Sequence, residues 1–113
     1  MTNIISYKEF DLVDIRVGTI ISAEEYLKLN NPAIILKIDF GEKIGIKKSS
    51  AQLIKNYKSK DLINKQIAAV VNFESKQIGN LTSEVLVLGF PDNFNEPVLI
   101  EPNKMIPNGG KLF

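Results

Sequence analysis

The residues best suited to bind a ligand stand together in the stretch IGIKKSSAQLIKNY, residues 44–57. Lys47 and Lys48 can neutralise an anion, and Ser49 and Ser50 add hydroxyl groups that donate or accept hydrogen bonds. The chain has no histidine and no cysteine, so it lacks the usual general base, thiolate nucleophiles, disulfides and the commonest metal ligands. This chemistry favours recognition of a ligand over its transformation.

Positive charge is concentrated in the middle of the chain. Residues 43–76 hold eight lysines against Asp61 and Glu74, a net charge of +6, whereas residues 1–42 and 77–113 carry −3 and −2. A basic segment inside a chain of net charge +1 favours a localised anionic partner. The alternative is that these lysines form an ordinary solvated face.

An enzyme is the weakest of the function classes. The thirteen carboxylates are scattered, with Glu24 and Glu25 at the end of an expected strand and Asp11 and Asp14 three residues apart. The sequence contains no glycine-rich phosphate loop and no nucleophile motif. We therefore predict no catalytic site, no metal site and no cofactor.

The elements that must position these residues are mostly strands. Residues 12–25 alternate, with Val17 and Ile21 on one side and Arg16 on the other, which predicts a long half-buried strand. Gly18 inside this strand predicts a bulge or a sharp bend.

A hairpin is expected to follow. Residues 33–40 predict a second strand and residues 43–48 a third. Alternation within the third strand places Lys47 away from the neighbouring isoleucines and toward a groove, and it places Lys48 at the corner where the strand ends.

Later segments mix a helix signal with apolar strands. Ser49 followed by Gln52 has the spacing of a capping box, which predicts a short helix that begins near residue 50. Residues 66–73 and 83–90 are apolar on both alternating faces, so each needs cover beyond a small barrel, and a second subunit is a natural source. The tail, residues 95–113, is cut by Pro and Gly into short apolar pieces that predict edge strands.

The order of these elements is strand, strand, strand, short helix, strand, then further strands. That order is typical of the OB-fold, a five-stranded Greek-key barrel that often binds oligonucleotides. We therefore predict an all-β chain, an OB-fold five-stranded barrel with a short helix between strands 3 and 4 and extra C-terminal strands at a dimer interface. The length fits a single domain spanning residues 1–113.

Five blocks of sequence, in this order and spacing, resemble a known family. They are DIRVGTIISAEE, IDFG, SSAQLI followed by a tyrosine, DLINKQIAAVVNF, and SEVLVLG. The chain resembles, from about Phe10 to the PNGGK near its end, the tRNA-binding-domain family of methionyl-tRNA synthetase C-terminal extensions and free-standing tRNA-binding proteins. Within that family the resemblance is greatest to the CsaA branch, described as an export-related chaperone. It implies a non-catalytic OB-fold homodimer that binds tRNA in the broad family and unfolded or pre-export polypeptides in the CsaA branch.

The resemblance also assigns residues. The family has Ser-Gly before its helix, and these two positions correspond to Ser49 and Ser50. Serine in place of the glycine, as at Ser50, is also the pattern of the CsaA branch. The family's asparagine after the fourth strand matches Asn72, and its serine before the fifth strand matches Ser83.

The chain departs from the family pattern where cations are expected. In place of Pro-Arg-Lys or Pro-Arg-Arg it reads ESKQI, which leaves Lys76 as the one cation there, and lysine cannot make arginine's planar bidentate contact. The family's lysine in the second strand appears as Ile35, and Lys37, two residues on and on the same face, can substitute.

The amino-acid composition fits a polypeptide-binding groove and an RNA-binding groove equally well. Tyr57 and Phe73 are candidates for base stacking, and Arg16 either pairs with Asp14 or Asp39 or lines the groove. Because the arginine pair is missing, polypeptide binding with a chaperone function ranks first and tRNA binding close behind, with export machinery as a further partner. The predicted peptide- or RNA-binding residues are Arg16, Lys37, Lys47, Ser49, Ser50, Asn72, Phe73, Lys76 and Ser83.

Nothing near the start of the sequence directs the chain to a membrane. The first ten residues lack the basic flank and the long apolar stretch of a secretion signal. No charge-free apolar run approaches the roughly 20 residues that span a bilayer. We therefore expect a cytoplasmic protein without membrane insertion.

Overall fold

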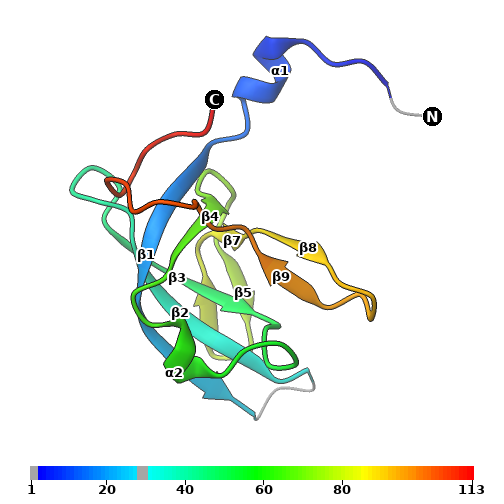
Figure 1. Cartoon of the computed structure of the whole chain (residues 1–113), viewed down its shortest axis with the longest axis vertical. Helices are drawn as coiled ribbons and strands as arrows, with labels where there is room; N and C mark the ends of the chain where they lie inside the picture. The colour runs from blue at the N-terminus through cyan, green and yellow to red at the C-terminus, as the bar shows by residue number, and fades with distance from the viewer. Residues whose placement is uncertain (1–2, 28–30) are drawn as a thin grey trace.

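The computed structural model describes residues 3–27 and 31–113, which form mainly β-strands (Figure 1). The elements are α1 (Tyr7–Asp11), β1 (Ile15–Tyr26), β2 (Ala33–Asp39), β3 (Ile46–Ala51), α2 (Ser59–Leu62), β4 (Gln66–Val70), β5 (Lys76–Ile78), β6 (Leu81–Ser83), β7 (Leu86–Val87), β8 (Gly89–Pro91) and β9 (Pro97–Leu99). Five strands form one sheet in the order β3-β2-β1-β4-β7, while β5 with β6 and β8 with β9 form two separate hairpins. In the described ranges no helix has the length and apolar character that crossing a membrane requires.

The sheet curls into an antiparallel half-barrel, and α2 lies between β3 and β4 along the chain (Figure 1). This arrangement confirms the predicted OB-fold. Strand β1 serves two neighbours, because its first half pairs with β4 and its second half with β2. Thr19 belongs to both ladders, opposite Asp39 on one side and Gln66 on the other. A register shift between Ile20 and Ser22 marks a bulge, which bends the strand from one neighbour to the next.

A bulge was predicted at Gly18, but the bulge lies further along the strand, between Ile20 and Ser22. Gly18 has a different role. A Cβ atom on Gly18 would lie 2.6 Å from Cγ2 of Ile38 and 2.7 Å from Cδ1 of Phe40, so the glycine lets two core side chains approach the backbone. The prediction that Val17 and Ile21 share a buried side is wrong. The core lies on the side of Gly18, Val17 is covered by the C-terminal tail, and Ile21 in the bulge is 42% exposed.

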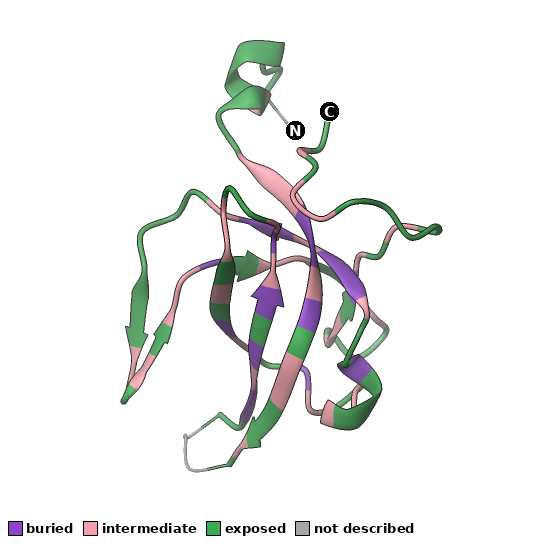
Figure 2. Ribbon diagram, turned by 90° about the vertical axis from the view of Figure 1, so that its left-hand side faces the viewer, coloured by how far each residue is buried: buried purple, intermediate pink, exposed green. Residues whose placement is uncertain are grey.

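Strand β2 provides the centre of the hydrophobic core. Its residues alternate, so that Ile34, Leu36 and Ile38 are fully buried while Lys37 points to solvent. Figure 2 shows buried positions in purple along the strands of the sheet, interrupted by intermediate and exposed ones. The side chains that complete the core come from the surrounding elements and are Ile20, Phe40, Leu53, Leu62, Ile67, Ala69, Val85 and Leu99.

The predicted helix start is wrong. Strand β3 continues through both serines to Ala51, and α2 begins at Ser59. The Ser49 hydroxyl donates to the carbonyl oxygen of Val85 at 3.1 Å instead of capping a helix, because the side chain is buried beneath that later segment. The hydrogen bond to Val85, 36 residues away, therefore replaces the local capping interaction that the sequence predicted.

The apolar strands predicted at 66–73 and 83–90 are shorter than expected. β4 ends at Val70, and the second segment divides among the end of β6, β7 and β8. The chain's own tail contacts the start of β4, where the Gln66 side chain donates to the Ile106 carbonyl at 2.6 Å and accepts from the Ile106 backbone N–H at 3.0 Å. In the tail, only β9 forms a strand, and it pairs with β8.

Two parts of the chain stand away from the barrel. α1 and the C-terminus lie at the same end of the molecule, and α1 has no buried residue (Figures 1 and 2). The β8–β9 hairpin projects to one side (Figure 1). Ser6 caps α1 through a capping box with Glu9.

Candidate functional site

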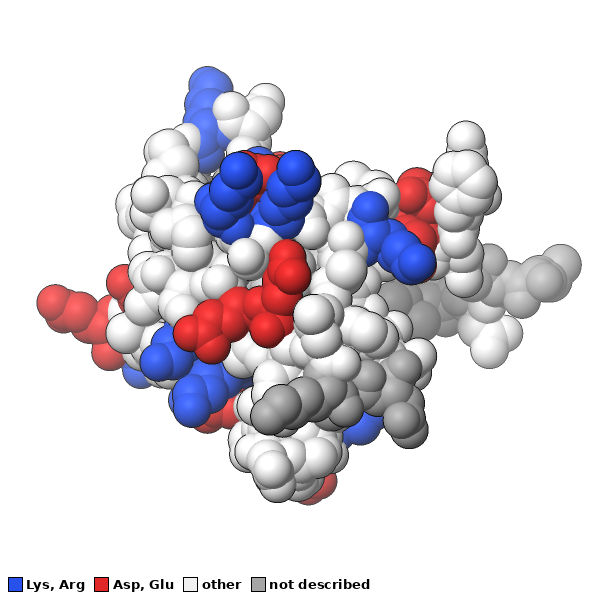
Figure 3. Space-filling view, turned by 90° about the horizontal axis from the view of Figure 1, so that it is seen from below, with Lys and Arg blue, Asp and Glu red and all other residues white. Residues whose placement is uncertain are grey.

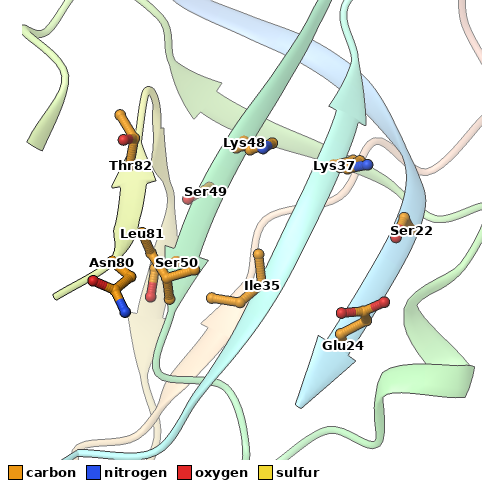
Figure 4. A pocket seen from close by; sticks show the side chains of 10 residues that line it. All are labelled: Ser22, Glu24, Ile35, Lys37, Lys48, Ser49, Ser50, Asn80, Leu81 and Thr82. Atoms are coloured by element: carbon orange, nitrogen blue, oxygen red, sulfur yellow. The ribbon is translucent and has the colours of Figure 1, made fainter. Parts of the chain in front are cut away.

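A depression of about 280 Å³ lies on the outer face of β1, β2 and β3. The β5–β6 hairpin forms one wall of this depression and β1 the other, with two lysine side chains between them (Figure 4). We call it the lysine pocket, and its lining residues are Ser22, Glu24, Ile35, Lys37, Lys48, Ser49, Ser50, Asn80, Leu81 and Thr82.

Lys37 and Lys48 are direct cross-strand neighbours in the β2–β3 ladder. Both are exposed and both line the pocket, and within residues 3–27 and 31–113 neither forms an ion pair. Like charges placed directly opposite one another destabilise a sheet. An anion between the two ammonium groups would relieve that repulsion, so the pair is suited to a phosphate or a carboxylate.

The structure places Lys48, rather than the predicted Lys47, in this pocket. Lys47 lies opposite Ile38, on the core side of the sheet, and is half-buried. The prediction assumed that Ile46 points inward, whereas Ile46 is 56% exposed near the end of the ladder. The side chains of β3 therefore point to the opposite faces of the sheet from those predicted.

Two of the predicted serines, Ser50 and Ser83, link β3 to the end of β6. The Ser50 backbone N–H donates to Oγ of Ser83 at 3.1 Å. Next to it, the Lys48 backbone N–H donates to Oε1 of Glu84 at 3.0 Å, and the Glu84 N–H donates to the Lys48 carbonyl at 2.8 Å. These bonds occupy the outer edge of β3 and close the barrel on that side.

A second and more apolar depression, of about 430 Å³, is lined by the base of the same hairpin and by the segments that flank it. Phe73 is 57% exposed and Leu86 49% exposed, although both are large apolar residues. Exposed apolar side chains gathered at a cavity are typical of a binding surface. We call this depression the apolar pocket, and its lining residues are Phe73, Glu74, Lys76, Ser83, Glu84, Val85 and Leu86.

Tyr57, the other candidate for base stacking, has a structural role. Its hydroxyl accepts a hydrogen bond from the Leu99 backbone N–H at 2.9 Å, and its ring packs against the core. Phe73 is therefore the candidate whose ring is free to contact a ligand.

Arg16 and Asn72, like Lys47, lie away from both pockets. Arg16 pairs with Asp14, one of the two predicted partners, and donates to the Gly109 carbonyl at 2.9 Å. Asn72 ties the start of β1 to the end of β4: its Oδ1 accepts from the Asp14 N–H at 3.0 Å, and its Nδ2 donates to the Leu12 carbonyl at 2.8 Å. Both side chains use their polar groups to hold the fold.

The structure thus places six of the nine predicted residues in the two pockets. Lys37, Ser49 and Ser50 line the lysine pocket. Phe73, Lys76 and Ser83 line the apolar pocket. Sequence reasoning missed Lys48 as a pocket residue, together with Glu84, Leu86 and the tip of the β5–β6 hairpin. Asn80 next to Gly79 was a turn signal that could have located that tip.

Other titratable groups do not form a reactive cluster in the part of the chain that the structure describes. There, no three His, Cys, Asp or Glu side chains gather as a metal site would require. The pKa of Asp92 is lowered by the Glu96 backbone N–H, the Asn56 side chain and the Phe94 backbone N–H, and the pKa of Glu9 is lowered by Ser6. Both carboxylates lie outside the two pockets.

Charge on the surface is mixed. Viewed from below, lysine and arginine side chains form separate groups with acidic side chains between them (Figure 3). On that face the positive charge is not one continuous patch, so recognition of an anion depends on local pairs such as Lys37 and Lys48.

Comparisons with known proteins agree with this fold. The family model described as "Putative tRNA binding domain" matches residues 15–111. The chain is 33% identical over 106 residues to the methionine–tRNA ligase of Methanothrix thermoacetophila and 31% identical over 102 residues to that of Methanococcoides burtonii, covering 94% and 90% of this chain. It spans only 15% of the length of each of these relatives.

Solved structures of similar proteins include two chaperones. The crystal structure of chaperone CsaA from Bacillus anthracis is 45% identical with a TM-score of 0.91, covering 98% of this chain and 100% of that one. The CsaA chaperone protein from Picrophilus torridus is 48% identical with a TM-score of 0.88, covering 97% and 100%. A MetRS-related protein from Pyrococcus horikoshii shares the fold at 20% identity, with a TM-score of 0.86 and coverage of 99% and 100%.

Proposed function

The chain belongs to the putative tRNA-binding domain family, and from that premise we propose that it is a non-catalytic, chaperone-like protein that binds unfolded or pre-export polypeptides as a homodimer. Residues 1–113 act as one domain of this type in the cytoplasm, with export machinery as a further partner. The observation that carries the proposal is the apolar pocket, where Phe73 and Leu86 stay exposed beside a cavity of about 430 Å³. The likeness to two chaperones over nearly the whole chain supports it.

The apolar pocket fits one or two side chains of an extended polypeptide. Fully burying one large apolar side chain stabilises a complex by about 1.5–3 kcal/mol, which alone gives weak binding. A homodimer presents two such pockets, and binding at the second is strengthened by the high effective concentration of a tethered segment. Weak single contacts and a two-fold arrangement suit a protein that accepts varied clients.

Phe73→Ser tests the apolar pocket. We expect this variant to bind a permanently unfolded, reduced and carboxymethylated client about fivefold or more weakly in fluorescence anisotropy, because part of the buried apolar area is lost. Phe94→Ser is the matched control, since Phe94 is 84% exposed and lines neither pocket. Equal client affinity for wild type and Phe73→Ser would place the polypeptide elsewhere.

A second candidate function is tRNA binding, and the facing side chains of Lys37 and Lys48 in the lysine pocket favour it. Lysines that contact phosphates release condensed counterions, so affinity falls as salt rises. The family description supports this reading, and a tRNA backbone supplies the phosphates.

The double variant Lys37→Gln with Lys48→Gln tests the tRNA function. We expect it to bind unfractionated tRNA about tenfold more weakly at moderate salt and to lower the slope of log affinity against log salt by about 1 per lysine. Lys43→Gln with Lys55→Gln is the control, because it removes the same charge from two exposed lysines of the same basic segment outside both pockets. An equal loss in both double variants would assign tRNA binding to net charge alone.

A further inference from the structure

We propose that the lysine pocket and the apolar pocket hold different ligands at the same time, an RNA backbone in the first and an apolar polypeptide segment in the second. The inference rests on the two candidate functions above and adds that they do not compete. It predicts a ternary complex of protein, RNA and polypeptide on one chain.

The two pockets share no lining residue, although residues of the β5–β6 hairpin line both of them. Asn80, Leu81 and Thr82, at the tip of the hairpin, line the lysine pocket (Figure 4). Lys76 and Ser83, at its base, line the apolar pocket. A ligand can therefore fill either cavity without occupying the other.

The net charge of each pocket favours a different ligand. The lysine pocket has two lysines against Glu24, a net charge of +1, and the apolar pocket has Glu74 and Glu84 against Lys76, a net charge of −1. Phosphates are attracted to the first pocket and repelled from the second. The apolar floor of the second pocket attracts hydrophobic side chains, which the first pocket lacks the apolar surface to cover.

The wall between the pockets is fixed to the barrel by hydrogen bonds. Lys48 and Glu84 exchange two bonds, of 3.0 and 2.8 Å, and Ser83 accepts from the Ser50 N–H at 3.1 Å. The Lys48–Glu84 pair uses only the backbone of Lys48, so its ammonium group remains available to an anion. Because these bonds are complete without any ligand, filling one pocket does not require the wall to move, and coupling between the sites should be weak.

A titration of both ligands on the purified full chain tests the inference. The probes are a fluorescently labelled, uncharged apolar peptide of about a dozen residues and unlabelled, unfractionated tRNA. With tRNA at about 30 times its own Kd, direct competition would raise the apparent peptide Kd about 30-fold. We expect a change of less than about threefold, with an unchanged number of peptides bound per chain, and we expect labelled peptide and labelled tRNA to sediment together with the protein.

Variants assign each ligand to its pocket. Lys37→Gln with Lys48→Gln should weaken tRNA binding and leave the peptide Kd within about twofold, and Phe73→Ser should do the reverse. Displacement of the peptide in proportion to added tRNA, or loss of both ligands in either variant, would overturn the inference while leaving the proposed functions intact. Failure of either probe to bind alone would overturn the inference and the candidate function to which that probe belongs, polypeptide binding or tRNA binding, and the single-ligand titrations reveal that case separately.

Discussion

At the scale of single residues, Lys37 and Lys48 carry the strongest indication of an anionic ligand. Two ammonium groups on facing positions of one hairpin repel each other in the absence of a ligand, and the described part of the chain offers neither an ion-pair partner. Ser49, by contrast, is 2% exposed, and its hydroxyl donates a hydrogen bond to the Val85 carbonyl. It therefore stabilises the site from the core side of the sheet. Adjacent residues of one strand thus have opposite roles because their side chains point to opposite faces.

Gly18→Ala should destabilise the fold. The added methyl group would lie 2.6–2.8 Å from the fully buried side chains of Ile38 and Phe40, which cannot retreat in a packed core. We expect the free energy of unfolding to fall by about 1–3 kcal/mol in denaturant titrations.

Gly110→Ala is the matched control for this change. The nearest atom to its added Cβ is Cγ1 of Val17 at 3.9 Å, an ordinary contact, so its stability should change by less than about 0.5 kcal/mol. If both variants lost the same stability, the close approach of the core to Gly18 would not be the cause.

At the scale of elements, the β8–β9 hairpin depends on one carboxylate. Asp92 accepts hydrogen bonds from the backbone N–H groups of Phe94 at 2.8 Å and Glu96 at 2.9 Å, and from the Asn56 side chain at 3.0 Å. These donors lower the pKa of Asp92 from its usual 3.8, with the Glu96 bond the largest contribution. Because the folded-state pKa is the lower one, the stabilisation is present above pH 3.8 and is lost as the pH falls through the folded-state value.

Acid should therefore loosen this turn. In NMR titrations we expect the Asp92 carboxyl group to titrate below 3.8, with the amide signals of Phe94 and Glu96 changing over the same pH range. Asp92→Asn places an amide donor against the Asn56 side chain, so it should be less stable than wild type at pH 6, with a difference that disappears at the acid end. A stability difference that stays constant from pH 6 to pH 2 would show that the charge of Asp92 is not involved.

At the scale of the whole molecule, exposed apolar residues gather at the end that carries α1 and the C-terminus (Figure 1). Tyr7 is 70% exposed and Leu112 48% exposed, and α1 is a five-residue helix without a buried side chain. So short a helix is unstable unless it packs against something. We propose this end of the molecule, which includes the C-terminus, as the surface of the homodimer.

Sedimentation equilibrium at micromolar concentration should give twice the mass of the chain. Tyr7→Lys with Leu112→Lys should yield a folded monomer, because two buried and unpaired charges in each subunit would oppose association. Phe94→Lys, on the β8–β9 hairpin, should remain a dimer. A wild-type monomer under these conditions would count against the homodimer and against the strengthening of client binding that depends on it.

The class of fold and most of its strands follow from local signals in the sequence. Alternation over residues 12–25 and 33–40 predicted β1 and β2, and the apolar run from residue 66 predicted β4, although β4 ends at Val70. The same local reading found a false capping box at Ser49 and passed over the true one at Ser6, because spacing alone does not show which backbone N–H groups lack a partner.

Which side chains share a pocket is set by how the strands align in the folded chain. The bulge at Ile21 and the reversed parity of β3 depend on pairing with β2, and the bonds between Lys48 and Glu84 join positions 36 residues apart. A shift of one residue in register exchanges the two faces of a strand, and register is set by the partner strand and by closure of the barrel. For that reason the sequence could name lysines and serines as binding residues, whereas the choice of Lys48 over Lys47 and the division into two pockets required the folded chain.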